Sequence, residues 1–308
     1  MEHGDAPQHG LQTRLIHAAA GANETPAVSP PIYQTSTFKM SSPEAGAALA
    51  AQVAPATFYT RYGSPNEKQA EVLLATLEGA EAALAVASGM AAITIALMSN
   101  LRAGDHMVAQ RTHYTAALSL LTEVLPRYGI EVTHVAQTEP EAFARAMRPS
   151  TRVVYTESPT NPTLDLTDLR ATADIAHAGK ALAITDNTFA SSFNQRPLDF
   201  GYDLVIHSAT KYLNGHADVT AGALMGSQAL IDRAWEYLRV YGPVLHPFEA
   251  WLLRRGMQTY PLRMAAHNRN AQQVAEFLEG HAQVEQVYYP GLASHAQHAL
   301  ARRQMVGG

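Results

Sequence analysis

The chain has 308 residues, of which 47% are hydrophobic and 16% are charged, so it is long enough for a large core and for more than one domain. Its formal net charge of −5 leaves no basic surplus for binding a nucleic-acid backbone. The absence of cysteine excludes disulfide bonds, thiolate metal sites and a catalytic thiol, so any chemistry must come from other side chains or from a cofactor.

The beginning of the chain lacks the basic start and the apolar run of a signal peptide. No later stretch approaches about 18 uninterrupted apolar residues, the length of a membrane span. We therefore expect no membrane segment and a cytoplasmic location.

Residues 1–62 are interrupted by prolines, which disfavour regular helices and strands. Among these prolines are Pro26, Pro30, Pro31, Pro43 and Pro55. We predict a largely irregular N-terminal arm. An arm of this length is expected to pack on more than its own subunit, so it indicates contact with a neighbouring subunit.

From residue 63 to about 246, short apolar runs alternate with longer stretches of helical period. This pattern is typical of an α/β fold with a mostly parallel sheet flanked by helices on both faces. The predicted strands are 82–87, 106–109, 132–135, 152–156, 182–186, 204–207 and 221–225. The main predicted helices are 67–77, 91–100, 114–128, 140–147 and 166–178. Residues 247–308 add a helix through Trp251, a long helix over 262–280 and a short strand over 284–288.

Lys211 lies in the segment HSATKY (207–212), directly after a predicted strand. A lysine at the carboxyl end of a strand can form a Schiff base with an aldehyde, and the hydroxyls of Ser208 and Thr210 can bind a phosphate. This arrangement is typical of the way pyridoxal 5′-phosphate (PLP) is anchored. The alternative is a solvated surface lysine, which is the commoner role of a lysine considered alone.

Two further segments follow predicted strands and suit the same cofactor. Asp186 ends an apolar run, and its carboxylate could pair with the pyridine nitrogen; the alternative is a helix cap. The segment SGM (88–90) opens a predicted helix, so its backbone amides suit a phosphate; the alternative is an ordinary turn.

The chain has fourteen histidines, but no two of them form a helical pair with a supporting carboxylate, so we predict no metal site.

Six segments of the chain form a more specific pattern. They are PIYQTSTF (31–38), YTR (59–61), SGMAA (88–92), ESPTNP (157–162), DNT (186–188) and SATKY (208–212). In this order they resemble the PLP-dependent enzymes of cysteine and methionine metabolism, which include cystathionine γ-synthase, cystathionine γ-lyase and methionine γ-lyase. The resemblance runs from about Leu11 to the last residue. It implies a type I PLP-dependent transferase fold, with an arm over 1–62, a PLP-binding domain over 63–246 and the start of a C-terminal domain over 247–308.

The resemblance also implies a role for each matching residue. Lys211 would form the Schiff base with the cofactor and act as general base, and Asp186 would pair with the ring nitrogen. Thr188 would lie against the ring, Tyr114 would stack on its other face and Asn161 would approach the ring hydroxyl. The phosphate would be held by Ser88, Gly89, Met90, Ser208 and Thr210.

Tyr59 and Arg61 would reach the phosphate in the neighbouring subunit, a task that suits the planar, permanently charged guanidinium group. The alternative is a surface arginine in a loop. The resemblance therefore implies a homodimer with shared active sites, usually assembled as a homotetramer, that acts on a small amino-acid substrate.

Two departures from the family narrow the expected activity. Methionine γ-lyases have a cysteine where this chain has Ala116, and a Lys-Asp pair where it has Leu238-Arg239. We expect γ-elimination or γ-replacement on sulfur amino acids or O-activated homoserine, of the cystathionine γ-synthase or γ-lyase type. Methionine γ-lyase and cystathionine β-lyase activity rank below it. An aminotransferase of similar fold and a non-enzymatic cofactor-binding subunit are the alternatives from other classes.

Members of the family continue beyond the position of Gly308 as a C-terminal α/β domain, which carries the arginine that binds the substrate α-carboxylate. Arg302 and Arg303 match the helix before that domain's next strand. We therefore expect a fragment or frameshifted product that builds the cofactor site but lacks a complete substrate site. An inactive, truncated PLP-binding subunit is the corresponding alternative.

Overall fold

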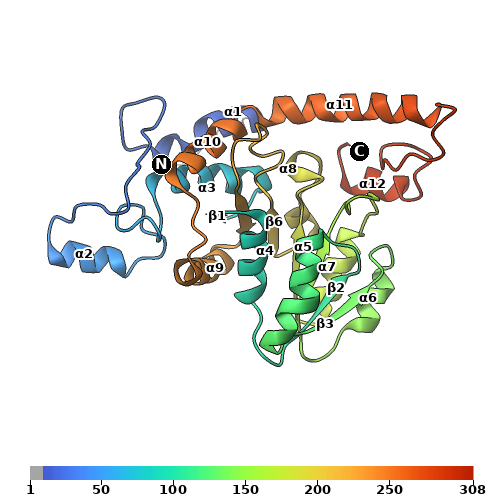
Figure 1. The fold of residues 1–308 in the computed structure, drawn as a ribbon, viewed down its shortest axis with the longest axis horizontal. Coiled ribbons are helices and arrows are strands. Elements are labelled where there is room, and N and C mark those ends of the chain that lie inside the picture. Colours follow the sequence, from blue (N-terminus) through green and yellow to red (C-terminus); the bar gives the residue numbers. More distant parts are fainter. Residues whose placement is uncertain (1–9, 308) are drawn as a thin grey trace, which may run out of the picture.

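The computed structural model describes residues 10–307 and has a seven-stranded sheet at its centre (Figure 1). The strands are β1 (Ala82–Val86), β2 (His106–Gln110), β3 (Glu131–Val135), β4 (Thr151–Glu157), β5 (Leu182–Asp186), β6 (Leu204–His207) and β7 (Gly222–Gly226). Their order across the sheet is β1-β7-β6-β5-β4-β2-β3. All seven strands predicted for residues 82–225 are confirmed, with ends that differ by at most one residue.

The sheet is mostly parallel, as predicted. The neighbours from β3 to β6 run parallel to one another, whereas β7 is antiparallel to both β1 and β6. In the register of the parallel strands, Glu157 at the end of β4 lies beside Asp186 at the end of β5, and Asp186 lies beside Ile206 in β6. Polar residues that end neighbouring strands are thereby brought to one edge of the sheet.

One face of the sheet is covered by α4 (Gly89–Met98), α9 (Gln228–Tyr241) and a helical segment over 115–128. α4 is apolar nearly all round and is buried between the sheet and its neighbours. Residues 114–128 were predicted as one helix; in the structure Tyr114 is its N-cap. The segment consists of α5 (Thr115–Ser119), a π-helical turn (Leu120–Val124) and a 3₁₀ turn (Leu125–Tyr128). Pro126 lacks the backbone N–H that a continuous α-helix requires there.

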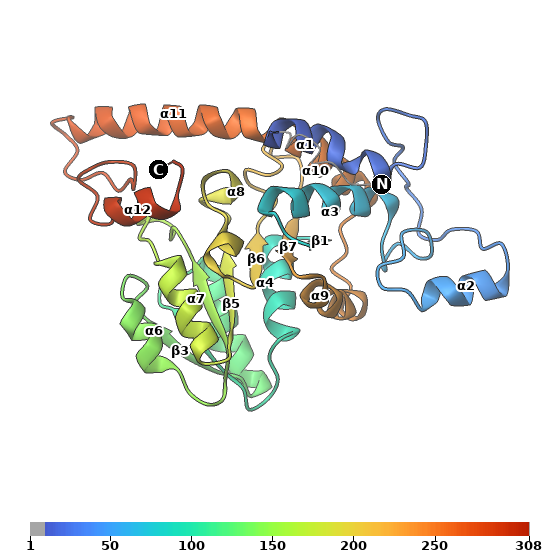
Figure 2. The same cartoon turned by 180° about the vertical axis from the view of Figure 1, so that it is seen from behind.

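The opposite face carries α3 (Pro65–Glu78), α6 (Pro140–Ala146) and α7 (Leu169–Ala178), as the view from behind shows (Figure 2). Two short elements, α8 (Ser191–Asn194) and a 3₁₀ turn (Pro197–Phe200), connect β5 to β6. Helices therefore cover both faces, and the predicted α/β class is confirmed.

The arm over 1–62 was predicted as largely irregular, and this prediction is wrong for two stretches of the described part. α1 (Leu11–His17), the 3₁₀ turn Ala18–Ala22 and α2 (Pro43–Ala50) are helical. Leu15 is fully buried and belongs to a core cluster with residues of α3, so α1 packs on its own chain. The reason is that no proline lies within α1 or the turn that follows it, and Pro43 occupies the first position of α2, where a helix tolerates proline.

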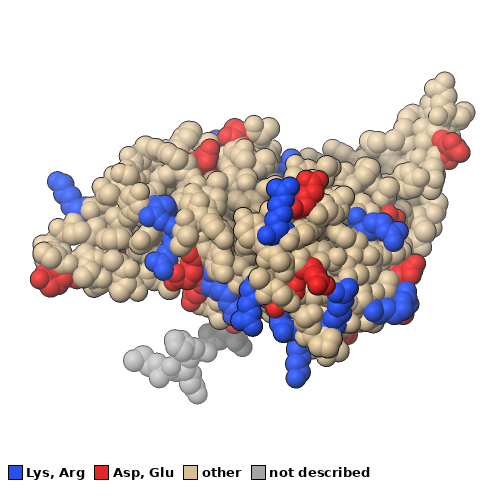
Figure 3. All heavy atoms as spheres, turned by 60° about the horizontal axis from the view of Figure 1, so that its bottom comes forward, with Lys and Arg blue, Asp and Glu red and all other residues tan. Residues whose placement is uncertain are grey.

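Beyond the sheet, the chain forms α10 (Pro247–Met257), the long α11 (Tyr260–Glu279) and α12 (His298–Gln304). The strand predicted over 284–288 is wrong: these residues are irregular, because none of the described residues pairs with them as a neighbouring strand. None of the helices within residues 10–307 combines the length and apolar character needed to cross a membrane. On the face shown in Figure 3, basic and acidic side chains are interspersed.

Candidate active site

A cavity of about 380 Å³ lies where β4, β5 and β6 end. Ten of the twelve residues predicted to bind the cofactor line it: Ser88, Gly89, Met90, Tyr114, Asn161, Asp186, Thr188, Ser208, Thr210 and Lys211. The cavity also has four lining residues that sequence reasoning did not single out: Ile93, Glu157, Phe189 and Thr220. The tertiary fold thus gathers segments separated by more than a hundred residues of sequence around one space.

The amino end of α4 forms one wall of the cavity. Ser88 is the N-cap of this helix, and its Oγ accepts the backbone N–H of Ala91 at 3.1 Å. The hydroxyl group keeps its own hydrogen, so both it and the backbone amides at the start of α4 could donate to an anion. A Cβ atom at Gly89 would lie 2.8 Å from Cβ of Ser208, so only glycine allows these two segments to approach so closely.

Hydroxyl groups also fix the opposite wall. Thr188 Oγ1 accepts the backbone N–H of Ser208 at 2.7 Å, which ties the loop after β5 to the loop after β6. Thr210 Oγ1 exchanges hydrogen bonds with the backbone of Ala221, at 3.1 Å to its oxygen and 2.9 Å from its nitrogen. Lys211 is exposed and follows within the same turn. The hydroxyl group of Thr210 was predicted to bind the phosphate. In this structure it is hydrogen-bonded to the backbone of Ala221 instead.

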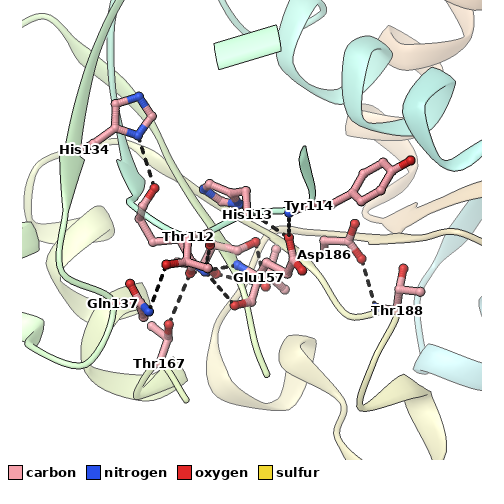
Figure 4. Close-up of polar contacts among 12 residues, drawn as sticks. Thr112, His113, Tyr114, His134, Gln137, Glu157, Thr167, Asp186 and Thr188 are labelled. Carbon is pink, nitrogen blue, oxygen red and sulfur yellow. Dashed lines mark hydrogen bonds and ion pairs between the residues drawn. The ribbon is translucent and has the colours of Figure 1, made fainter. Parts of the chain in front are cut away.

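Asp186 is buried at the floor of the cavity, where its exposed fraction is 7%. Burial raises the pKa of its carboxyl group to about 6, and the neighbouring Glu157 adds to the increase. The backbone N–H of Thr188 donates to Asp186 Oδ1 at 2.9 Å, which opposes that effect (Figure 4). A positively charged group beside this desolvated carboxylate would be attracted strongly, because little solvent screens the two charges.

Glu157 is a second buried carboxylate of the cavity. Its Oε2 accepts the backbone N–H of Tyr114 at 2.8 Å, and burial raises the pKa of Glu157 to about 7. The side chain of Gln110 bonds both backbone groups of Glu157 at 2.9 Å, which holds the end of β4 in place. The sequence could have indicated Glu157 as a site residue, because it ends a strand, as Asp186 does, and opens the segment ESPTNP.

Tyr114 lies at the start of α5, and its ring is half exposed at the cavity. Figure 4 shows it on the side of Asp186 and Thr188. Asn161 lies on the loop that follows β4 and is exposed. These are positions from which an aromatic ring and an amide could contact a bound cofactor.

Tyr59 and Arg61 are not brought to this cavity. The Arg61 guanidinium lies 5.2 Å from the centre of the Tyr59 ring and donates to the backbone oxygen of Arg239. Tyr59 is 36% exposed. In this single chain the two side chains form a separate group on the surface.

The cavity matches the chemistry of PLP at three of the cofactor's polar groups. A lysine amine suits its aldehyde, a desolvated carboxylate suits its ring nitrogen, and a helix amino end with a glycine cradle suits its phosphate. Among residues 10–307, no group of three or more histidine, aspartate or glutamate side chains could hold a metal ion.

Known proteins are similar to this chain over nearly its whole length. The family model described as Cys/Met metabolism PLP-dependent enzyme matches residues 12–308. An L-methionine gamma-lyase of Porphyromonas gingivalis is 46% identical over 99% of this chain and 77% of its own length. A cystathionine gamma-lyase of Bacillus subtilis is 42% identical over 96% of this chain and 76% of its own length.

The fold is shared with solved structures as well. The crystal structure of metB from Corynebacterium glutamicum has a TM-score of 0.91 and 35% sequence identity, and the match covers 97% of this chain and 77% of that one. Family, fold and cavity chemistry agree, so the predictions of cofactor and enzyme class are confirmed. The chain belongs to the family of PLP-dependent enzymes of cysteine and methionine metabolism.

Proposed function

We propose that this chain binds PLP through Lys211 and acts on sulfur amino acids or O-activated homoserine by γ-elimination or γ-replacement. The observation that carries the proposal is that Lys211, Asp186 and the amino end of α4 face one cavity. Each of these groups suits a different part of the same cofactor. When bound, the cofactor withdraws electrons from the α-carbon of the substrate and thereby acidifies its protons.

The side chains of this cavity divide the remaining work. Asp186 holds a proton on the ring nitrogen, because a buried carboxylate stabilises a positive partner. The Lys211 amine, once released by the substrate, moves protons between the α- and β-carbons. Tyr114 orients the ring by stacking, which contributes about 0.5 to 1.5 kcal/mol. The amides of Gly89 and Met90 bind the phosphate at the positive end of α4.

In γ-elimination the bond between the γ-carbon and its sulfur or oxygen substituent breaks, and water then releases ammonia and a 2-oxo acid. In γ-replacement a thiol takes the vacated position. Ala116 and Leu238-Arg239 favour an enzyme of the cystathionine γ-synthase or γ-lyase type. Methionine γ-lyase activity is the second candidate, because the relative from Porphyromonas gingivalis, at 46% identity, carries that name.

The first experiment is the absorption spectrum of the purified 308-residue chain with PLP, before and after borohydride. We expect a visible band that borohydride removes while attaching the cofactor to the protein, and no such attachment in Lys211→Ala. Mass spectrometry of the trapped peptide checks the site of attachment. A trapped cofactor in the Lys211→Ala variant would contradict the assignment.

A product assay separates the candidate reactions. Cystathionine, methionine and O-succinylhomoserine are supplied in turn, and 2-oxo acid, ammonia and thiol are measured. Ammonia with a 2-oxo acid indicates elimination, which also releases cysteine or a thiol from the sulfur substrates and succinate from O-succinylhomoserine, whereas a keto acid without ammonia indicates transamination. Cofactor trapping without any product from these substrates, also when O-succinylhomoserine is supplied together with a thiol, supports a binding subunit without activity.

We further propose that active sites are shared between subunits of a homodimer, usually paired as a homotetramer in the cytoplasm. The support is that Tyr59 and Arg61 lie outside the cavity of their own chain. Tyr59 is on the surface, where a second subunit can use the pair.

A further inference from the structure

Two buried carboxylates face the cavity, although the proposed cofactor has a single ring nitrogen to pair with them. Glu157 and Asp186 are directly opposite each other on the neighbouring strands β4 and β5. Their exposed fractions are 4% and 7%, so solvent screens neither of them well. Two negative charges in such surroundings repel each other strongly. One of the two groups must therefore stay neutral or have its charge compensated.

His113 is the polar side chain that packs against Glu157. Its side chain is fully buried, and its Nδ1 lies 3.7 Å from Oε2 of Glu157. The imidazole is stacked on the ring of Tyr155, with 4.8 Å between the ring centroids and an angle of 6° between the planes. Neither ring nitrogen has a hydrogen-bond partner. A buried polar group without a partner costs about 1 to 3 kcal/mol, so its position calls for an explanation.

Glu157 also connects this histidine to the cofactor side of the cavity. The same Oε2 that approaches His113 accepts the backbone N–H of Tyr114 at 2.8 Å. Figure 4 shows His113 and Glu157 together beside Asp186, with Tyr114 directly following. A change of charge on Glu157 therefore acts on both the Tyr114 backbone and the field around Asp186.

We propose that His113 and Glu157 form a positioning pair, in which the neutral imidazole packs against a protonated Glu157 carboxyl group, so that Asp186 alone offers a negative charge to the ring nitrogen. The pair holds Tyr114 through its backbone and does not touch the reacting atoms. This inference rests on the proposed cofactor site, and it adds a function for two residues that the proposal above leaves unassigned.

The groups around the pair determine where the proton resides. Glu157 and Tyr155 come from β4, Asp186 from β5 and His134 from β3. Lys211 faces the same cavity as Glu157 from the loop after β6. Burial raises the pKa of Glu157 to about 7, whereas burial and the neighbouring His134 lower the pKa of His113 to about 3. Below pH 7 the proton is thus on Glu157, and above pH 7 its loss adds a second negative charge beside Asp186.

The first test uses infrared spectroscopy of the cofactor-free protein between pH 5 and 9, so its outcome does not depend on cofactor chemistry. We expect a carboxylic-acid carbonyl band that disappears with a midpoint near pH 7. The part of this band that comes from Glu157 should be missing from Glu157→Gln, whose amide oxygen still accepts the Tyr114 N–H, while the parts from the other buried carboxyl groups, such as Glu71, remain. In His113→Phe, which keeps the ring stack, the midpoint should rise by about one pH unit because the carboxylate loses a polar neighbour.

Tyr155→Phe is the matched control, because it removes a buried hydroxyl group next to His113 but keeps the stacked ring. We expect its midpoint to equal that of the unchanged chain. An identical band in Glu157→Gln, or an unchanged midpoint in His113→Phe, overturns the proposal. If His113→Phe does not fold, as judged by circular dichroism, the Glu157→Gln comparison decides alone.

The second test follows the visible absorption and circular dichroism of the PLP-loaded protein over the same pH range. We expect a change with a midpoint near pH 7 or above that Glu157→Gln abolishes and Tyr155→Phe retains. The double variant His113→Phe with Glu157→Gln should behave like Glu157→Gln, because the histidine acts only through the carboxyl group. A further shift in the double variant contradicts the pairing. If the protein does not bind PLP at all, that result counts against the proposed function and only this second test is lost. The infrared test still shows whether His113 and Glu157 form the proposed pair.

Discussion

At the residue scale, Glu71 of α3 shows how burial changes the behaviour of a single carboxyl group. Its Oε1 accepts the backbone N–H of Ala85 at 3.2 Å, and Lys68 Nζ lies 3.9 Å from Oε2. Burial raises the pKa of Glu71 from 4.5 to about 7, and the attraction of Lys68 opposes this only in part. The folded state therefore favours the protonated form, and its stability falls as the pH rises from 4.5 through 7.

From this we predict that Glu71→Gln stabilises the protein above pH 7 and not at pH 4.5. The amide oxygen keeps the bond from Ala85, and the difference between the two pKa values corresponds to at most about 3 kcal/mol. Urea unfolding at several pH values measures the effect. Glu123→Gln, at an exposed position, is the control and should show no such pH dependence. An equal gain at acid and alkaline pH would contradict the explanation by burial.

Gly89 is a second residue whose surroundings set its identity. A methyl group at this position would lie 2.8 Å from Cβ of Ser208, so Gly89→Ala must separate α4 from the loop after β6. We expect a loss of about 1 to 3 kcal/mol in the free energy of unfolding and at least a tenfold weaker affinity for PLP. Equilibrium dialysis with PLP measures the affinity. Gly46→Ala, where a Cβ meets only the flexible side chain of Met40, should leave it unchanged.

At the element scale, the amino end of α4 has to serve both the helix and the proposed phosphate. Ser88 caps α4 by accepting the N–H of Ala91, and Ser227 caps α9 in the same way by accepting the N–H of Leu230. Of these two capping serines, Ser88 lines the cavity and Ser227 does not. Replacing each serine in turn therefore separates the effect of the N-cap on stability from its effect on cofactor binding.

We predict that Ser88→Ala and Ser227→Ala each lower the free energy of unfolding by about 1 kcal/mol, because each removes an N-cap. Only Ser88→Ala should also weaken PLP binding, since it loosens the amides that face the phosphate. Thermal unfolding gives the stabilities and the visible absorption band gives the affinities. Equal affinities in the two variants would show that the end of α4 plays no part in binding.

At the scale of the whole molecule, the proposed sharing of active sites can be tested by mixing two defective variants. Arg61→Ala keeps Lys211, and Lys211→Ala keeps Arg61, so a hybrid dimer contains one complete site. Random mixing makes about half of the dimers hybrid, which restores about a quarter of the sites. Cofactor trapped by borohydride at limiting PLP concentration measures this recovery. If each chain uses its own Arg61, mixing restores nothing.

Much of the fold followed from local patterns. Apolar runs and helical periods predicted every strand of the sheet, and Lys211 and Asp186 were assigned because each follows such a run. The arm and the strand over 284–288 were predicted less well. α1 depends on packing against α3, and a strand depends on a partner, and neither is visible in a short window of sequence.

The sequence by itself determined the class of the fold, the cofactor and most of the residues around the cavity, because motifs and periodicity are local properties of the chain. Only the tertiary structure decided that β7 is antiparallel and that Glu157 lies beside Asp186, because strand order joins segments distant in sequence. The structure alone also placed His113 against Glu157. Their pKa values depend on burial, which is a property of the packed molecule and not of either residue.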